Sequence, residues 1–327
     1  MLENINIIDY KCFKDFKLDG IKRINIISGT NNVGKTALLE ALFIQNADPF
    51  STLSTIAQNR DIKEKYFQNY VQKTKYSVIS NDIEYNFEVK NKKDLNKNEI
   101  TEKDKLNADY EEFNCLYFNN KFLLTPLSNI NMMEDNVYSY INSSKPSNDK
   151  LVKLYSKIQT LGLQHKFLEY LQLLDNNIKW VEPQLINDEL VMRVNLAKPE
   201  ISLLTSELGE GVNRFIEILC SMLSIEKKEY QRYKSIFIDE IENGLHYSKL
   251  LDIAKAIIEI AQKEDIQVFI TTHDKDTIEA FAKASEELSF QDISSIKLTK
   301  DENNKIVPIV RQYDNFTYGI ERGADMR

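Results

Sequence analysis

The stretch from Ile26 to Leu42, IISGTNNVGKTALLEAL, constrains the fold of this chain more than any other part of the sequence. Its first residues end a mostly apolar run typical of a buried strand, and apolar residues recur at helical spacing after Thr36. Gly29 and Gly34 lie between the two patterns, in a chain that has only nine glycines. The stretch therefore predicts a strand, a glycine loop and a helix in succession, as in α/β proteins.

The loop from Gly29 to Thr36 matches the pattern G-x-x-x-x-G-K-[ST]. In this pattern, the glycines let backbone N–H groups surround the α- and β-phosphates of a nucleotide. Lys35 is expected to reach the β- and γ-phosphates, and the hydroxyl of Thr36 is expected to bind Mg²⁺. The alternative is a glycine turn that only begins a helix. We predict an ATP site with these nucleotide-binding residues: Asn31, Asn32, Val33, Gly34, Lys35, Thr36 and Ala37.

A second apolar run, SIFI, is followed by two acidic residues, Asp239 and Glu240. Sheets of α/β proteins bind ligands beyond the carboxyl ends of their strands, where these two carboxylates are expected to lie. Asp239 suits a magnesium ligand, and Glu240 suits the base that orients or deprotonates an attacking water. Without the glycine loop, the same pattern would more often be ordinary surface acids at a strand end.

A third apolar run, VFITT, ends directly before His273. A histidine at this strand end can donate a hydrogen bond to the γ-phosphate and so contribute to catalysis. Taken alone, such a histidine is more often a structural hydrogen-bonding group. Of the other two histidines, His246 is expected to cap a helix and His165 to lie on the surface.

The segment TSELGEGVNRF places Gly209 and Gly211 at the start of a predicted helix. The exposed N–H groups at the start of a helix bind anions, so this segment is a second candidate phosphate site. The alternative is a plain capping turn, with Thr205 or Ser206 as the capping residue.

The rest of the chain predicts one α/β domain, residues 1–327, with a mixed, mainly parallel sheet and two lobes. A helical lobe at about 120–205 is expected between the glycine loop and the Gly209 segment, because 148–177 has two amphipathic helical patterns. The polar run at 91–107 is predicted to be an exposed loop. Further strands are expected at 4–10, 13–18, 75–90, 178–183, 189–196, 266–272, 293–298 and 306–313. Further helices are expected at 248–262, at 276–284 and at the end of the chain.

Composition excludes some classes of protein and leaves others open. Three widely spaced cysteines, without metal-type spacing, favour a reducing compartment, and no apolar run approaches the length of a membrane helix. We therefore expect a soluble cytoplasmic protein. The net charge of −8 argues against a globally basic nucleic-acid binder, although a local basic groove would keep DNA binding open.

The order of the motifs GTNNVGKT, LGEGVNR, IFIDE with IENGLH, and TTHD resembles that of ABC-type ATPases of the SMC-like group. The forms NNVGKTALLEA, DEIENGLH and TTHD look most like the ATPase domain of OLD-like proteins of bacterial defence systems. This resemblance implies an ABC-type ATPase head that holds ATP and Mg²⁺. It gives Lys35, Asp239, Glu240 and His273 the roles expected above.

The resemblance also implies a homodimer or higher homo-oligomer, in which the signature loop of one subunit closes the ATP site of the other. The segment from Leu208 departs from the signature L-S-G-G-Q, with Gly209 at the serine position, Glu210 at the first glycine and Val212 at the glutamine. Lys11, in YKCF, stands where relatives approach the nucleotide with an arginine.

Two functions from different classes follow. The first is an ATP-hydrolysing switch or sensor whose dimerisation controls a separately encoded protein effector in anti-phage defence. OLD-like nucleases carry a nuclease domain after the histidine motif, whereas only about fifty residues follow His273, so we expect the effector on another chain. The second is a nucleic-acid-binding ATPase of repair or recombination. ATP hydrolysis measured with and without DNA separates the two.

Overall fold

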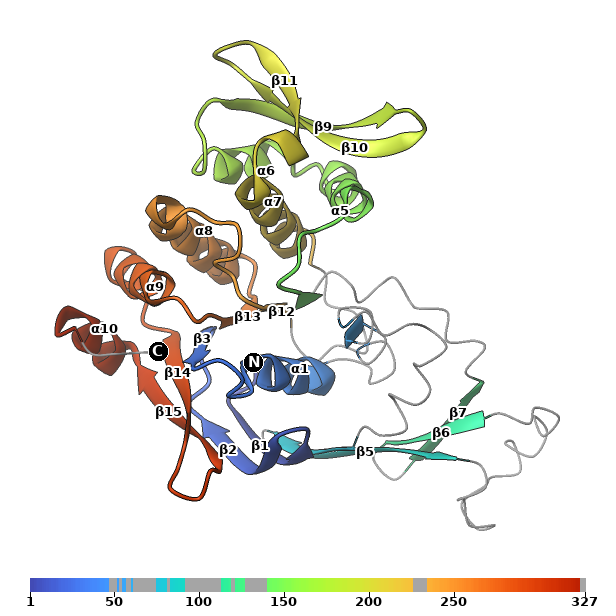
Figure 1. The fold of residues 1–327 in the computed structure, drawn as a ribbon, viewed down its shortest axis with the longest axis vertical. Helices are drawn as coiled ribbons and strands as arrows, with labels where there is room; N and C mark the ends of the chain where they lie inside the picture. Colours follow the sequence, from blue (N-terminus) through green and yellow to red (C-terminus); the bar gives the residue numbers. More distant parts are fainter. Residues whose placement is uncertain are drawn as a thin grey trace.

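The computed structural model describes residues 1–46, 52, 55, 56, 60, 75–80, 83–91, 113–118, 121–126, 140–225 and 234–323. Most of the segment predicted to be an exposed loop, residues 92–107, lies outside the described residues. The described residues form a central sheet, an antiparallel sheet beside it, and a small sheet at one end (Figure 1).

The central sheet carries the motifs. Among the described residues it has six strands in the order β15-β14-β3-β13-β12-β8. All neighbouring strands are parallel except β14 and β15, so the predicted mixed, mainly parallel sheet is confirmed. The strands are β3 (Ile24–Gly29), β8 (Tyr140–Ile141), β12 (Ser235–Ile238), β13 (Gln267–Thr271), β14 (Ile293–Lys300) and β15 (Ile306–Gln312).

Helices cover both faces of this sheet. On one face, α1 (Lys35–Asn46) lies between the central and the antiparallel sheet (Figure 1). The other face packs against helices from the second half of the chain, which are α7 (Glu210–Leu223), α8 (Leu250–Lys263), α9 (Lys275–Glu287) and α10 (Tyr313–Glu321). Strands that are buried on both faces read as continuous apolar runs, which is why SIFI and VFI could be recognised in the sequence.

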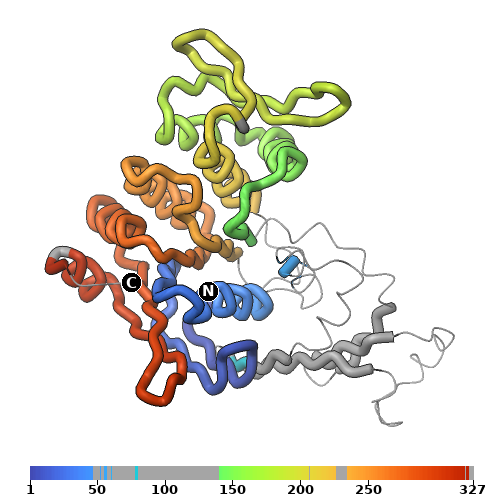
Figure 2. Tube along the Cα trace, in the orientation of Figure 1, coloured from blue at the N-terminus to red at the C-terminus, as the bar shows by residue number. Residues whose placement is uncertain are grey.

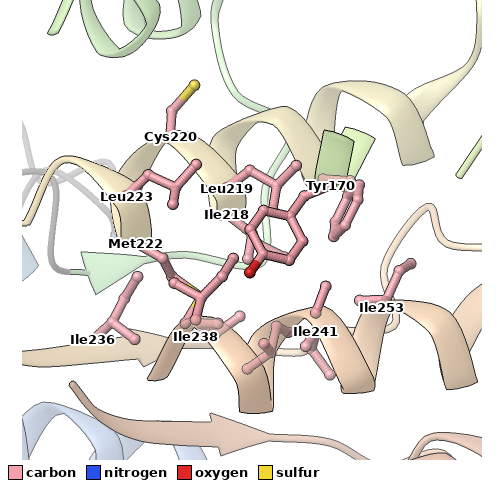
Figure 3. Close-up of a cluster of buried hydrophobic side chains, with 14 of the residues drawn as sticks. Tyr170, Ile218, Leu219, Cys220, Met222, Leu223, Ile236, Ile238, Ile241 and Ile253 are labelled. Atoms are coloured by element: carbon pink, nitrogen blue, oxygen red, sulfur yellow. The ribbon is translucent and has the colours of Figure 1, made fainter. Parts of the chain in front are cut away.

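Alternate residues of β12 enter two different cores. Ile236 and Ile238 belong to the core formed with α7 and α8, whereas Phe237 points into the core around α1. Figure 3 shows Ile236 and Ile238 against Ile218 and Met222 of α7. Both faces of β12 are therefore buried up to Ile238. Asp239 and Glu240 follow directly and lie at the carboxyl edge of the sheet.

The antiparallel sheet has the strand order β2-β1-β4-β5-β6-β7 among the described residues. The chain starts in this sheet, and its C-terminal strand β15 lies beside β2 (Figure 2). The sequence predicted strands at the N-terminus and at 75–90 but not their assembly into a sheet. The strands are β1 (Asn4–Tyr10), β2 (Phe13–Asp19), β4 (Lys75–Ser80), β5 (Ile83–Asn91), β6 (Phe113–Phe118) and β7 (Lys121–Pro126).

The part of the chain predicted as a helical lobe, at about 120–205, contains helices and, from Ile178 on, the strands expected at 178–183 and 189–196. Two amphipathic helices are formed as predicted, α5 (Asn148–Thr160) and α6 (Gln164–Leu171). They pack beneath a three-stranded antiparallel sheet of β9 (Ile178–Ile186), β10 (Glu189–Leu196) and β11 (Ile201–Leu204). The lobe is therefore mixed, because the apolar side chains of β9 and β10 need helices to bury them on one face.

Within the described residues, no helix is long and apolar enough to cross a membrane.

Candidate nucleotide site

The glycine loop connects β3 to α1 and has the backbone conformation that its sequence predicts. Gly29, Asn32 and Gly34 have φ angles of 142°, 61° and 104°. A Cβ atom on Gly29 would lie 2.6 Å from the carbonyl oxygen of Leu298, and one on Gly34 would lie 2.9 Å from Sγ of Cys12. These positions therefore require glycine both for the angle and for space.

Lys35 begins α1, and its ammonium group is held inside the loop. Its Nζ donates hydrogen bonds to the carbonyl oxygens of Gly29 at 2.9 Å and Thr30 at 3.2 Å. Burial lowers the pKa of Lys35 from its ordinary value, and the carboxylates of Glu240 and Asp239 oppose this shift. The loop thus holds a cation beside the first N–H groups of the helix, which have no acceptor within α1. Both features favour phosphate oxygens.

The next residue, Thr36, meets Asp239 at the end of β12. The Thr36 hydroxyl lies 3.2 Å from each carboxylate oxygen of Asp239, and the Thr271 hydroxyl donates to Oδ1 at 2.6 Å. Burial raises the pKa of Asp239, and the charge of Glu240 adds to this shift, while both threonines oppose it. No lysine or arginine in the described part of the chain forms an ion pair with this carboxylate.

These observations fit a magnesium site. A buried carboxylate without an ion-paired cation, beside a hydroxyl oxygen, is a donor set that suits a hard divalent ion completed by phosphate and water oxygens. The described residues contain no cluster of three or more histidine, cysteine or acidic side chains that would bind a metal by themselves. Thr36 and Asp239 would therefore hold Mg²⁺ together with the nucleotide.

Glu240 leaves the strand end in a strained conformation. Its φ angle is 47°, which is uncommon for a residue with a Cβ atom. Its N–H donates to the Thr271 hydroxyl at 2.8 Å, and its Oε2 accepts a hydrogen bond from the amide of Asn243 at 3.0 Å. Strained backbone of this kind is often found at active sites, and here it directs a carboxylate toward the cavity described next.

One cavity of about 510 Å³ is lined by Lys35, Thr36, Glu240 and His273. Other residues of the glycine loop, and an arginine that is distant from the loop in the sequence, complete its wall. The remaining lining residues are Asn31, Asn32, Gly34, Ala37 and Arg60. Val33 differs from the prediction, because its side chain is buried in the core around α1 and does not line the cavity. Its N–H donates to the carbonyl of Thr30.

His273 follows β13 and is held by Glu242. Its Nδ1 lies 2.8 Å from Oε1 of Glu242, and its backbone N–H donates to the same oxygen at 2.9 Å. The other oxygen of Glu242, Oε2, is buried and accepts no hydrogen bond from a described residue. Glu242 thus fixes the ring orientation and leaves Nε2 as the nitrogen available to a ligand.

The Gly209 segment does not line this cavity. Gly209 is the N-cap of α7, with a φ angle of 95° and no side-chain hydrogen bond, while Thr205 lies in a short 3₁₀ helix (Thr205–Glu207). The N-cap of α7 is therefore Gly209 and not Thr205 or Ser206. A Cβ atom on Gly211 would lie 2.5 Å from the carbonyl oxygen of Gly244, so the start of α7 packs directly on the loop after Glu240.

Lys11 does not line the cavity either. It forms an ion pair with Glu40 on α1, and Nε of Arg60 donates to the other oxygen of Glu40 at 2.7 Å. Burial lowers the pKa of Lys11, and the charge of Glu40 opposes this shift. Of the two basic residues that contact Glu40, Arg60 lines the cavity and Lys11 does not.

Sequence reasoning missed Arg60, Glu242 and Thr271 as site residues. Glu242 lies two positions after Glu240, and Thr271 lies two positions before His273. This closeness to predicted site residues could have identified both of them. Arg60 has no neighbouring motif. The two remaining histidines are as predicted: His246 caps a 3₁₀ helix (Tyr247–Lys249) through a hydrogen bond from the N–H of Ser248, and His165 is exposed.

Comparison with known proteins agrees with this geometry. A family model described as "AAA domain, putative AbiEii toxin, Type IV TA system" matches residues 24–278, from β3 to α9. A Helicobacter pylori protein named "ATP/GTP phosphatase" is 24% identical over 388 aligned positions, which cover all of both chains.

Two solved structures share the fold. One is an SMC head bound to the C-terminal winged-helix domain of ScpA, with a TM-score of 0.54 and 12% identity over 96% of this chain and 98% of that one. The other is an SMC head with an extended coiled coil, bound to the C-terminal domain of ScpA from Pyrococcus furiosus. Its TM-score is 0.52, with 11% identity over 98% of both chains. Because the family model covers most of the sequence and includes the glycine loop, Asp239 and His273, this chain belongs to the AbiEii-like AAA ATPase domain family, with a fold like that of SMC heads.

Proposed function

We propose that this protein binds and hydrolyses ATP, and that the nucleotide controls its association with a second copy and with a separately encoded effector. The observation that carries the proposal is the convergence of Lys35, Thr36, Glu240 and His273 on one cavity, with Asp239 hydrogen-bonded to Thr36. These are the residue types that phosphoryl transfer to water requires, and they are held at three places: the start of α1, the end of β12 and the end of β13.

Each side chain has a role that its position supports. Lys35 and the first turn of α1 neutralise and orient the phosphates. Thr36 and Asp239 would hold Mg²⁺, which supplies positive charge to the phosphate oxygens. Glu240 orients or deprotonates the attacking water, while its carboxylate is steadied by the amide of Asn243. His273, fixed by Glu242, donates to the terminal phosphate.

A nucleotide-dependent dimer is supported by the start of α7. This turn has no side-chain cap and does not line the cavity of its own chain. Its N–H groups therefore suit an anion supplied from elsewhere, such as the terminal phosphate bound by a second subunit. We propose that Gly209 to Arg214 of one chain faces Lys35 of its partner.

Two of the similarities to known proteins support control of a separately encoded effector. The family description names a putative toxin of a type IV toxin–antitoxin system, which supports a role in bacterial defence, as expected from the resemblance to OLD-like proteins. The similar SMC heads were solved with a bound protein, ScpA, which supports the idea that this fold can present a surface to a partner. We propose a nuclease or toxin encoded separately as the effector.

The first experiment measures phosphate release from ATP and from GTP with Mg²⁺, because the Helicobacter relative is named for both nucleotides. Hydrolysis that is lost in Glu240→Gln and does not respond to DNA supports the switch. A rate that rises several-fold with double-stranded DNA favours the alternative, a nucleic-acid-binding ATPase of repair or recombination. No phosphate release from either nucleotide would refute the enzymatic part of the proposal.

The second experiment tests the effector. Tagged Glu240→Gln protein, which should retain ATP, is isolated from its native cells with and without nucleotide. Retention of one defined protein only with ATP supports the switch, and the Lys35→Ala variant is the matched control because it should not bind ATP. Equal retention by both variants would contradict control by the nucleotide.

A further inference from the structure

Arg214 lies on the second turn of α7, outside the cavity, yet its guanidinium reaches the main chain of the acidic turn. Nη2 donates to the carbonyl oxygen of Asp239 at 2.6 Å and lies 3.4 Å from that of Glu240. Nη1 donates to the carbonyl of Asn142, which follows β8 at the neighbouring edge of the sheet. One side chain therefore joins α7, the end of β12 and the segment after β8.

The charge of Arg214 is buried and balanced by a network. Only 3% of its side chain is exposed, and Nη1 lies 3.4 Å from Oε2 of Glu217, whose side chain is fully buried. Glu217 in turn is paired with Nζ of Lys150 on α5 at 2.6 Å. Two buried charges on one helix are costly unless they are paired and hydrogen-bonded, so the network is a constraint that keeps the guanidinium in one place.

We propose that Arg214 is a positioning residue for hydrolysis, which holds the Asp239–Glu240 turn in its strained conformation and so aims the Glu240 carboxylate. The φ angle of 47° at Glu240 costs free energy and persists only where surrounding contacts enforce it. Two of those contacts are carbonyl oxygens bound by Arg214. Without the guanidinium, the peptide groups on either side of Glu240 lose their buried donor, and the turn is free to relax.

The same contact links the turn to the start of α7. Arg214 lies five residues after Gly209, and Gly211 touches the backbone of Gly244, two residues before the capping His246. A movement of the start of α7, caused by a phosphate or a second subunit, would therefore be passed to Glu240 through a rigid fork of hydrogen bonds. This coupling rests on the proposed function, whereas the structural role of Arg214 does not.

The test replaces Arg214 with lysine, which keeps the charge but cannot contact several carbonyls with a fixed planar fork. The expected result is a kcat for ATP hydrolysis that falls about 10- to 100-fold, because a small misplacement of a catalytic group has effects of this size. The affinity for ATP, measured by calorimetry, should stay within about threefold of wild type. The matched control is Arg193→Lys, because Arg193 also binds a main-chain carbonyl, that of Ser202, but lies on β10. Its kcat should not change.

A second readout does not depend on hydrolysis. The N–H groups of Asp239 and Ile241 donate to the carbonyls of Ile141 and Thr271. Hydrogen exchange of a peptide covering 239–245 should therefore be faster in Arg214→Lys than in wild type, while the α8 peptide is unchanged.

Wild-type kcat together with wild-type exchange at 239–245 would overturn the proposal. A parallel fall in kcat and ATP affinity, with faster exchange in α8 as well, would indicate general destabilisation and would also overturn it. If the wild-type protein releases no phosphate at all, the proposed function fails, but the exchange measurement still decides whether Arg214 holds the turn.

Discussion

The hydroxyl of Thr36 and the carboxylate of Asp239 lie 3.2 Å apart although 203 positions separate them in the chain. The contact arises because β3, β13 and β12 are parallel neighbours, so that the glycine loop and the acidic turn both leave the same edge of the sheet. Lys35 precedes one of these residues and Glu240 follows the other. Lys35, Thr36 and Glu240 thereby line one cavity, and the carboxylate of Asp239 lies behind the Thr36 hydroxyl that it contacts.

Replacing Lys35 with alanine should abolish stable ATP binding and leave the fold intact. Its ammonium group is held beside the helix start, and charge-assisted contacts to phosphate contribute about 1.5–3 kcal/mol, equivalent to a roughly 10- to 150-fold loss of affinity. Calorimetry measures the affinity and thermal unfolding checks the fold. Lys275→Ala, on the exposed part of α9, is the control. Unchanged affinity in Lys35→Ala would refute the phosphate-loop assignment.

Replacing Glu240 with glutamine should preserve ATP binding and lower turnover. Glutamine keeps the size of the side chain but removes the carboxylate, and general-base contributions are typically about 10²- to 10⁴-fold in rate. Single-turnover hydrolysis and equilibrium binding are measured on the same preparation. If the variant turns over at the wild-type rate, Glu240 is not the base, although the nucleotide site stands.

Replacing Asp239 with asparagine should have opposite effects on binding and on stability. The affinity for ATP with Mg²⁺ should fall by about tenfold or more, because a metal ligand serves ground state and transition state alike. Burial raises the pKa of Asp239 in the folded protein, so the unliganded protein loses stability as pH rises from the ordinary carboxyl range through the raised value. Asparagine carries no such penalty.

At neutral pH, unliganded Asp239→Asn should therefore melt at a higher temperature than wild type, and the difference should shrink as the pH is lowered toward 4. Differential scanning calorimetry over this range, without nucleotide, measures it. A variant that melts below wild type at every pH would show that the carboxylate stabilises the empty site.

Gly211→Ala should weaken the contact between α7 and the loop after Glu240. The added Cβ would lie 2.5 Å from the carbonyl oxygen of Gly244, so one backbone must move. Gly162→Ala is the matched control for a loop glycine, because a Cβ there meets nothing within 4 Å, although its φ angle of 69° strains alanine. Hydrolysis should fall about tenfold or more in Gly211→Ala only. Equal rates in the two variants would mean that this contact is not needed.

With ATP bound, the protein should be at least a dimer. The start of α7 offers N–H groups that do not reach the cavity of their own chain. Light scattering of Glu240→Gln at micromolar concentrations should show an ATP-dependent doubling of mass, which Lys35→Ala should lack. A strict monomer with ATP would contradict the proposed arrangement of Gly209 to Arg214 against a partner.

The sequence alone determined the glycine loop, the acidic strand end and the position of His273. Each of these is a short-range pattern in which an apolar run, a loop and a functional residue are adjacent in the chain. In a sheet with helices on both faces, such a run is buried and its end lies at the ligand-binding edge. The SMC-like ATPase fold, the mainly parallel sheet and the contact between Thr36 and Asp239 could therefore be predicted before the structure, whereas the resemblance to OLD-like proteins stays a prediction.

Tertiary structure alone decided which residues support that site. The contacts of Arg214 with the acidic turn and of Arg60 with Glu40 join segments whose patterns carry no information about each other. It also showed that Lys11 faces Glu40 rather than the cavity, and that β9, β10 and β11 form one sheet that packs on α5 and α6. Such contacts depend on how whole elements pack, since the position of a side chain within about 1 Å follows from the crossing of helices and sheets and not from local spacing.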